Sequence, residues 1–298
     1  MLKRNACAAA LLLPLLGGLY CANKRMVGFH LIGRNVEIDP ATFGKTELDT
    51  TISEGKLVGF LEPFSAENNN QEADYSTSVQ KQRRKRIPGI KGWKFIFDKS
   101  NCFQNEFNKL DNSEAWTFVP VLEDGSALFY IKSNGKISGF DCDIFVGTYD
   151  APLTADVTGV SVEIDLTPKG TRNWQNSADV FTPTEFRFDE INPIAGLNIE
   201  VPALVSGATT TKIKVKSLCS DSSITGLTDP TNWAVETDGV RAAPTGIAYD
   251  PVNSEYTFTH PALVAATSVS FVTTKNGFDI YAKDTSYYSG HSATKKVA

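Results

Sequence analysis

The sequence predicts a mainly β protein with two β-rich domains: an N-terminal antiparallel sandwich or barrel with one flanking helix, then a small immunoglobulin-like β-sandwich. Short runs of β-branched and aromatic residues recur along the chain, and Asp-Gly or Asn-Gly pairs separate several of them. A chain of 298 residues is also long enough for two domains of ordinary size. We expect an apolar arm over residues 1–24, a first domain over 25–180 and a second over 190–298.

The first residues resemble a targeting signal. A basic start precedes an apolar run from Ala8 to Leu16, and Cys21 follows at the position of a lipoprotein-type cysteine. Against a signal, Pro14 interrupts the run and the bulky Tyr20 stands where a small residue is expected before the cut. The run is also too short to span a bilayer. We therefore expect an apolar arm buried in an assembly and no membrane anchor, with a signal peptide or lipid anchor as the alternative.

The first domain is expected to open with two strands, Arg25 to Glu37 and Lys56 to Leu61, the second ended by Pro63. Residues 64–90 are then too polar to build a core. The segment begins acidic and ends in the dense basic run KQRRKR from Lys81 to Arg86. A loop of this length inside a domain is uncommon and is usually functional or disordered, so we expect a long functional loop.

A strand from Trp93 to Phe97 and a helix beginning at Asn101 should come next, with Gln104 placed as in a capping box. One apolar stripe on this helix should face the core, formed by Phe103, Phe107 and Leu110.

An antiparallel meander of three strands is predicted after the helix: Trp116 to Leu122, Ala127 to Lys132 and Ile137 to Gly147. Asp124-Gly125 and Asn134-Gly135 separate these strands, and such pairs tolerate the positive φ of a type I′ turn.

Beyond the meander, Gly159 to Leu166 alternates apolar and polar residues as a half-buried strand does, whereas Thr167 to Pro183 reads as polar and turn-rich. Short, evenly spaced strands then predict the second sandwich. They are Leu197 to Val201, Lys212 to Leu218, Tyr256 to His260, Val269 to Thr274 and Phe278 to Ala282. The Cys…Trp…Cys pattern of antibody domains is missing, so the likeness is one of architecture.

Few residues in the chain could carry chemistry. The three histidines, His30, His260 and His291, have no partner that the sequence names, and neither GxSxG nor a phosphate-binding loop occurs. We therefore expect no enzymatic activity, no cofactor and no metal site. The Asp141-Cys142-Asp143 run fits an amphipathic strand better than a metal site. The five cysteines are expected to be reduced, buried thiols.

The basic run is the candidate interaction site, with Lys81, Arg83, Arg84, Lys85 and Arg86 as the candidate contact residues. The formal net charge of −5 gives no general case for a DNA-coating protein. No aromatic residue lies within the run to stack on bases. We expect the run to contact an acidic patch on a neighbouring subunit, and the alternatives are a solvated loop or contact with phosphates.

The order of elements resembles the tail tube family of tailed bacteriophages. The resemblance rests on Cys7 and Gly17-Gly18 near the start, the following strand, the polar excursion and the block from Gly92 to Tyr149. It implies a β-sandwich with one flanking helix that forms stacked, hexameric rings around a β-lined channel. It also implies that a long loop from each subunit reaches the next ring, and that an immunoglobulin-like domain can be appended at the C-terminus.

The resemblance further implies a protein of the virion tail, assembled in the host cytoplasm. Its partners would be copies of itself, other tail proteins and DNA that passes without sequence-specific binding. A head-decoration or baseplate protein could contain the same elements. The alternative from another class is a secreted or lipid-anchored bacterial surface β-sandwich that acts as a binding module.

Overall fold

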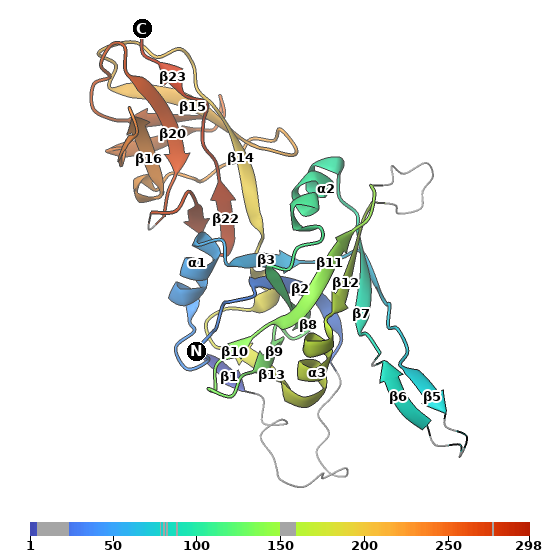
Figure 1. The fold of residues 1–298 in the computed structure, drawn as a ribbon. Coiled ribbons are helices and arrows are strands. Elements are labelled where there is room, and N and C mark those ends of the chain that lie inside the picture. Colours follow the sequence, from blue (N-terminus) through green and yellow to red (C-terminus); the bar gives the residue numbers. More distant parts are fainter. Residues whose placement is uncertain are drawn as a thin grey trace. The chain divides into compact units, whose positions relative to one another are not determined.

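The structure is a computed structural model that describes residues 1–4, 24–149 except 78, 80, 82 and 88, and 159–298 except 276 (Figure 1). It is mainly β, which confirms the predicted fold class. The chain divides into two compact units. One contains Met1–Leu48 and Lys56–Ile191, and the other contains Asp49–Gly55 and Asn192–Ala298.

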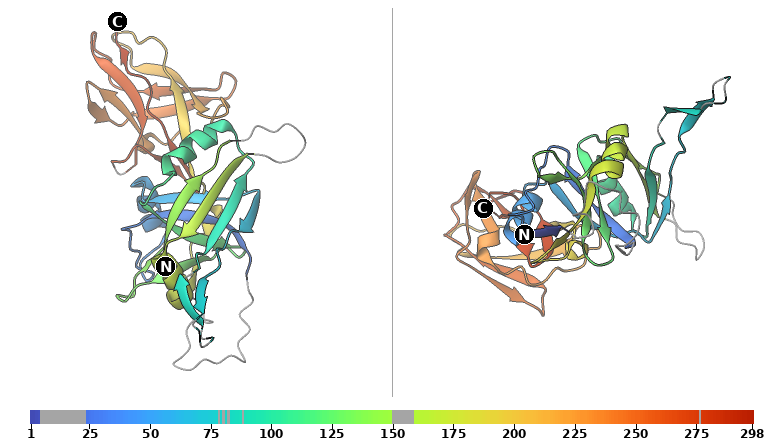
Figure 2. Two further views of the ribbon diagram at one scale, coloured as in Figure 1. Left: turned by 45° about the vertical axis from the view of Figure 1, so that its right-hand side comes forward. Right: turned by 90° about the horizontal axis from the view of Figure 1, so that it is seen from below.

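The N-terminal unit contains one large sheet. Its strands are β1 (Leu2–Arg4), β2 (Met26–Gly33), β3 (Leu57–Leu61), β4 (Ser65–Asn68), β7 (Gly92–Phe97), β8 (Trp116–Leu122), β9 (Ala127–Ile131), β10 (Ile137–Ser138), β11 (Phe140–Val146), β12 (Val160–Leu166) and β13 (Ala178–Pro183). They follow the order β1-β13-β9-β8-β11-β12-β7-β4, while β3 and β2 branch from β8 and β10 pairs with β9. Because β8 pairs with β2, β9 and β11, the sheet curls around its core (Figure 2).

Aromatic side chains fill this core. Alternate residues of β7 are buried, and the rings of Phe29 and Phe95 lie 4.6 Å apart between centroids. Trp93 packs on Phe118 at 4.8 Å. Large aromatic side chains give the most hydrophobic stabilisation for each residue buried, so β2, β7 and β8 are held mainly by these rings.

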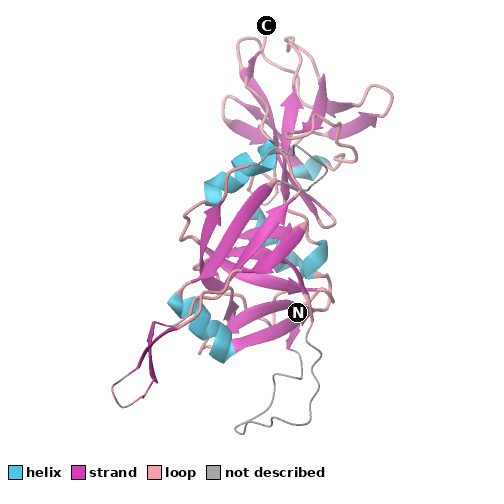
Figure 3. Ribbon diagram, turned by 90° about the vertical axis from the view of Figure 1, so that its right-hand side faces the viewer, coloured by secondary structure: helices cyan, strands magenta, loops and turns pink. Residues whose placement is uncertain are grey.

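The described residues form three α-helices (cyan in Figure 3): α1 (Lys45–Ser53), α2 (Asn101–Phe107), which continues into a 3₁₀ turn, and α3 (Pro168–Ser177). The sequence predicted α2 and its apolar stripe, of which Phe107 is buried while Phe103 and Leu110 pack against the same core. The predicted capping box is wrong. Ser100 is the N-cap and makes no side-chain bond there.

The segment from Thr167 to Pro183, expected to be turn-rich, forms α3 and β13 instead. Thr167 is the N-cap, and its hydroxyl accepts a hydrogen bond from the Gly170 amide at 3.1 Å. Pro168 occupies the first helical turn, where its missing N–H leaves no intrahelical bond unmade. The ring of Trp174 then contacts Phe140 at 4.9 Å, so one aromatic residue ties this polar helix to the core.

The predicted meander is wrong in its third strand. Residues 137–147 divide at Gly139 into β10, which pairs with β9, and β11, which pairs with β8 and β12. The chain therefore passes from one side of β8 to the other. A Cβ atom at Gly139 would lie 2.4 Å from the Thr117 hydroxyl oxygen, so this crossing requires glycine.

The C-terminal unit is a β-sandwich of two sheets. Its strands are β14 (Ile194–Glu200), β15 (Thr210–Ser217), β16 (Trp233–Thr237), β17 (Val240–Ala242), β18 (Gly246–Asp250), β19 (Glu255–Thr259), β20 (Ser268–Thr273), β21 (Tyr281–Lys283), β22 (Ser286–Ser289) and β23 (Lys295–Lys296). One sheet has the order β18-β19-β15-β14-β22-β21 and the other β17-β16-β20-β23. Strands β16, β17, β18, β22 and β23 were not predicted.

Trp233 lies at the centre of this sandwich. Its ring contacts Phe258 at 5.0 Å, and its indole N–H donates to the Leu227 carbonyl at 2.9 Å. The Tyr256 hydroxyl donates to the Ile224 carbonyl at 2.8 Å and accepts from the Leu227 amide. The polar ends of two buried aromatic residues therefore hold the same irregular segment, 224–227.

Residues Asp49–Gly55, far away in the sequence, group with the C-terminal unit. The buried Tyr287 of β22 donates its hydroxyl hydrogen to the Asp49 carboxylate. Burial and this carboxylate both raise the pKa of Tyr287. A domain boundary drawn at one position in the sequence therefore omits part of this unit.

Substituting Tyr287 with Phe should destabilise the full chain by about 1–2 kcal/mol, because a hydrogen bond to a charged acceptor is lost. In a fragment of residues 192–298, which lacks Asp49, the same substitution should have almost no effect. Urea unfolding of the four proteins measures both differences. Equal destabilisation in chain and fragment would show that the Tyr287 hydroxyl does not depend on Asp49.

Candidate functional site

The predicted loop over residues 64–90 is a β-hairpin. Strands β5 (Asp74–Thr77) and β6 (Arg83–Ile87) pair with each other. The register of β4 and β7 is kept from Ser65 opposite Ile96, through Gln71 opposite Ile90, to Asp74 opposite Ile87, and then shifts by one residue, so that Tyr75 lies opposite Lys85. Backbone bonds of 2.9 Å from Asn69 to Gly92 and from Gln71 to Ile90 join the two parts. One antiparallel ribbon therefore begins inside the sheet and continues beyond it.

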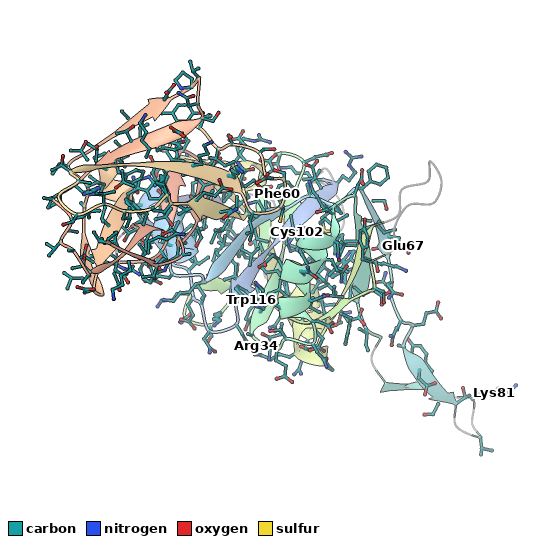
Figure 4. The ribbon with its side chains drawn as sticks, turned by 90° about the horizontal axis from the view of Figure 1, so that it is seen from above. Arg34, Phe60, Glu67, Lys81, Cys102 and Trp116 are labelled. Carbon is teal, nitrogen blue, oxygen red and sulfur yellow. The ribbon has the colours of Figure 1, made fainter. Side chains whose placement is uncertain are left out.

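The ribbon leaves the body of the unit (Figures 1 and 3). From Asn69 to Thr77 it spans nine residues, which is about 30 Å at the rise of an extended strand. Glu67 lies near its base and Lys81 at its far end (Figure 4). Lys81 has a φ of 62°, and all four residues of β5 are exposed. The hairpin, as we call residues 69–92, has no core of its own, and an isolated two-stranded ribbon is at best marginally stable in water.

The structure places the candidate contact residues on this hairpin. Lys81 lies in the connecting turn, while Arg83, Arg84, Lys85 and Arg86 lie in β6. The sequence indicated a polar segment with a basic end, but it did not indicate that this segment forms two paired strands. The sequence shows no alternation there because the first four residues of β6 are all cationic.

The N-terminal arm is described only at its ends. Residues 5–23 lie outside the described residues, and with them Cys7, Cys21 and the apolar run. Strand β1 pairs with β13, and Arg4 forms an ion pair with Asp179, whose side chain is 2% exposed. Residues before Cys21 therefore belong to the sheet and neutralise a buried carboxylate.

Two of the three histidines, His30 and His260, are buried, whereas His291 is exposed. Both ring nitrogens of the buried His30 face backbone carbonyls, at 3.1 Å from Val58 and 2.9 Å from Phe188. Burial lowers the pKa of His30 to about 4. His260 contacts the Thr211 hydroxyl at 2.8 Å, and His291 the Ser270 hydroxyl at 3.0 Å. Within the described ranges, no cluster of three or more His, Cys, Asp or Glu residues could hold a metal ion.

Two expectations about cysteine have different outcomes. Cys142 is free and buried between the core residues Phe140 and Ile144, and burial raises its pKa to about 12. The amphipathic interpretation of residues 141–143 is thereby confirmed. The expectation of reduced thiols is wrong for Cys102 and Cys219, which are each disulfide-bonded. Neither belongs to a CxxC pair, so sequence spacing gave no sign of this.

Comparisons with protein-family models, with curated proteins and with solved structures found no match for this chain. None of the helices in the described segments is both long and apolar enough to cross a membrane. A proposal about function therefore rests on the residues of this chain and on their arrangement.

The burial of His30 predicts a pH dependence of stability. Its pKa is about 4 in the folded chain and near 6.5 in the unfolded one, so between these values the unfolded chain binds the additional proton. Stability should be retained above pH 6.5 and should fall as the pH decreases towards 4, by at most about 1.4 kcal/mol per pH unit. Urea unfolding at a series of pH values tests this. The variant His30→Gln should lose this contribution, and a slope unchanged in that variant would contradict it.

Proposed function

We propose that the chain is a non-enzymatic structural subunit that assembles with copies of itself into stacked rings. The rings form the tail tube of a bacteriophage virion, through which DNA passes without sequence-specific binding. The observation that carries this proposal is the hairpin. A polar ribbon about 30 Å long that is continuous with the main sheet, yet has no core, is suited to reach a second subunit.

The N-terminal strand supports the same proposal. A chain cleaved before Cys21 would lose β1 and the Arg4 partner of the buried Asp179. Leaving a buried carboxylate without its partner is strongly destabilising. These contacts favour an arm that remains part of the folded subunit over a cleaved signal.

One observation favours the alternative, a secreted or lipid-anchored surface β-sandwich that acts as a binding module. Cys102 and Cys219 are disulfide-bonded, and disulfides are rare in the reducing cytosol where virion tails assemble. The mass of the intact chain isolated from its natural source separates the two proposals. A mass that lacks residues 1–20 and includes a lipid on Cys21 would favour the surface module.

Assembly is the direct test of the first proposal. Negative-stain microscopy of the purified chain should show rings or tubes, and sedimentation should show species much larger than a monomer. A monomer that persists at high concentration would contradict the tail tube proposal and leave the surface module as the better one.

Assembly should also change how the hairpin is cleaved. In the free subunit, trypsin should cut rapidly between Lys81 and Arg86, because the ribbon has few contacts that resist local opening. In rings or tubes the same bonds should be protected, because a docked ribbon is held closed. Mass spectrometry of a digestion time course gives both rates. Equal rates would show that the hairpin is not an inter-subunit arm.

A further inference from the structure

One face of the sheet in the N-terminal unit is acidic and faces solvent. On β11, β12, β7 and β4 it consists of residues on the side of the sheet opposite the core. Asp141 lies on the same side of β11 but is already paired with Lys169 and Arg34, so it is left out of the definition that follows. We define this acidic face by Asp143, Phe145, Glu163, Asp165, Lys94 and Glu67. Phe145 of β11, opposite Glu163, is 42% exposed.

The charges of the acidic face are poorly balanced. Asp143 and Asp165 are directly opposite each other on β11 and β12, a position in which like charges destabilise a sheet. Burial, together with the charges of Glu163 and Asp143, raises the pKa of Asp165, and its Oδ1 atom has no hydrogen-bond partner among the described residues. The amine of Lys94 lies 3.8 Å from Glu163 and is the one cation among the six residues that define the face. Asp165 Oδ1 is therefore an acceptor for which the described residues supply no hydrogen-bond donor.

The complementary charge lies on the hairpin of the same chain, where five of the six residues from Lys81 to Arg86 are cationic. The hairpin cannot bring them back to its own acidic face. It continues β4 and β7 in register as far as Asp74 and Ile87, where the pairing shifts by one residue, so Arg86 lies about 20 Å along the strand beyond Gly92, and Lys81 lies farther still. Figure 4 shows Glu67 and Lys81 at opposite ends of the ribbon.

We propose that the acidic face binds the basic hairpin of a second copy of this chain. The inference rests on the proposed self-assembly and names the surface that receives the hairpin. Arginine and lysine would supply the donor that Asp165 Oδ1 lacks, and would offset the repulsion between Asp143 and Asp165. Val79, fully exposed in the turn of the hairpin, offers an apolar contact for Phe145.

Cross-linking of isotope-mixed protein tests the contact. Equal amounts of normal and ¹⁵N-labelled chain are assembled and treated with a carbodiimide, which joins amines to carboxylates in contact. Peptides carrying one label each should link Lys81 or Lys85 to Asp143, Glu163 or Asp165. Mixed-label links to other carboxylates alone, or same-label links alone, would overturn the proposal.

Charge variants test whether the contact drives association. The pair D143N/D165N should raise the concentration needed for assembly on the order of tenfold, and added salt should then weaken assembly less than in the unchanged chain. The control E106Q/E114Q removes the same charge from residues outside the acidic face and should assemble normally. Equal effects of the two pairs would argue against the proposed site.

Exchanging the charges gives the sharper result. Chains with D143K/D165K and chains with R84E/R86E should each fail to assemble alone, because like charges then meet. Mixing them should restore assembly, because each hairpin finds an opposite face, and this rescue also shows that both variants fold. Normal assembly of either variant alone, or no rescue on mixing, would contradict the proposal.

The outcomes separate this inference from the proposed function. Rings or tubes without the expected cross-link would retain the tail tube proposal and overturn the site. The cross-link in a dimer that forms no ring would retain the site and overturn the tail tube. If R84E/R86E self-associates normally but no longer binds a short DNA duplex, the hairpin is a phosphate-binding element and the site is overturned.

Discussion

The burial of Trp93, Phe95 and Phe97 on one face of β7 is the constraint on which the N-terminal unit depends. Burying one such side chain contributes about 1.5–3 kcal/mol, so β7 is fixed more firmly than its short length suggests. Its pairing with β4 then determines where the hairpin begins and in which direction it runs. The hairpin is thus positioned by β7, which buries three aromatic side chains.

Negative and positive charges lie in different parts of the N-terminal unit, which β7 connects. Lys94 lies on the solvent side of β7, beside the carboxylates of the acidic face, while the dense basic run lies in the turn of the hairpin and in β6. Without the five cations of that run, the formal charge of −5 would be −10. The chain therefore has an acidic body and a basic extension, which is the charge distribution that the proposed contact between two copies requires.

Sequence patterns predicted the elements whose apolar residues have a clear period, and missed those fixed by a single contact. The stripe of Phe103 and Phe107 predicted α2, and alternation predicted β12. Helix α3 has one large aromatic contact with the core, through Trp174, and a cap at Thr167, and the division of the third meander strand depends on space at Gly139. The basic run could be found from composition, whereas the acidic face could not, because Asp143 and Asp165 become neighbours only through strand pairing.

The continuity of the hairpin with the sheet also has a mechanical consequence. Tension applied at the hairpin tip would pass along β4 and β7 in the direction of the strands. The hydrogen bonds between β7 and β12 run across that direction, from Val160 opposite Phe97 to Asp165 opposite Gly92. They would be loaded in shear and would share the force, whereas bonds pulled open from one end break in succession. A ribbon without a core can therefore still transmit force into the folded body.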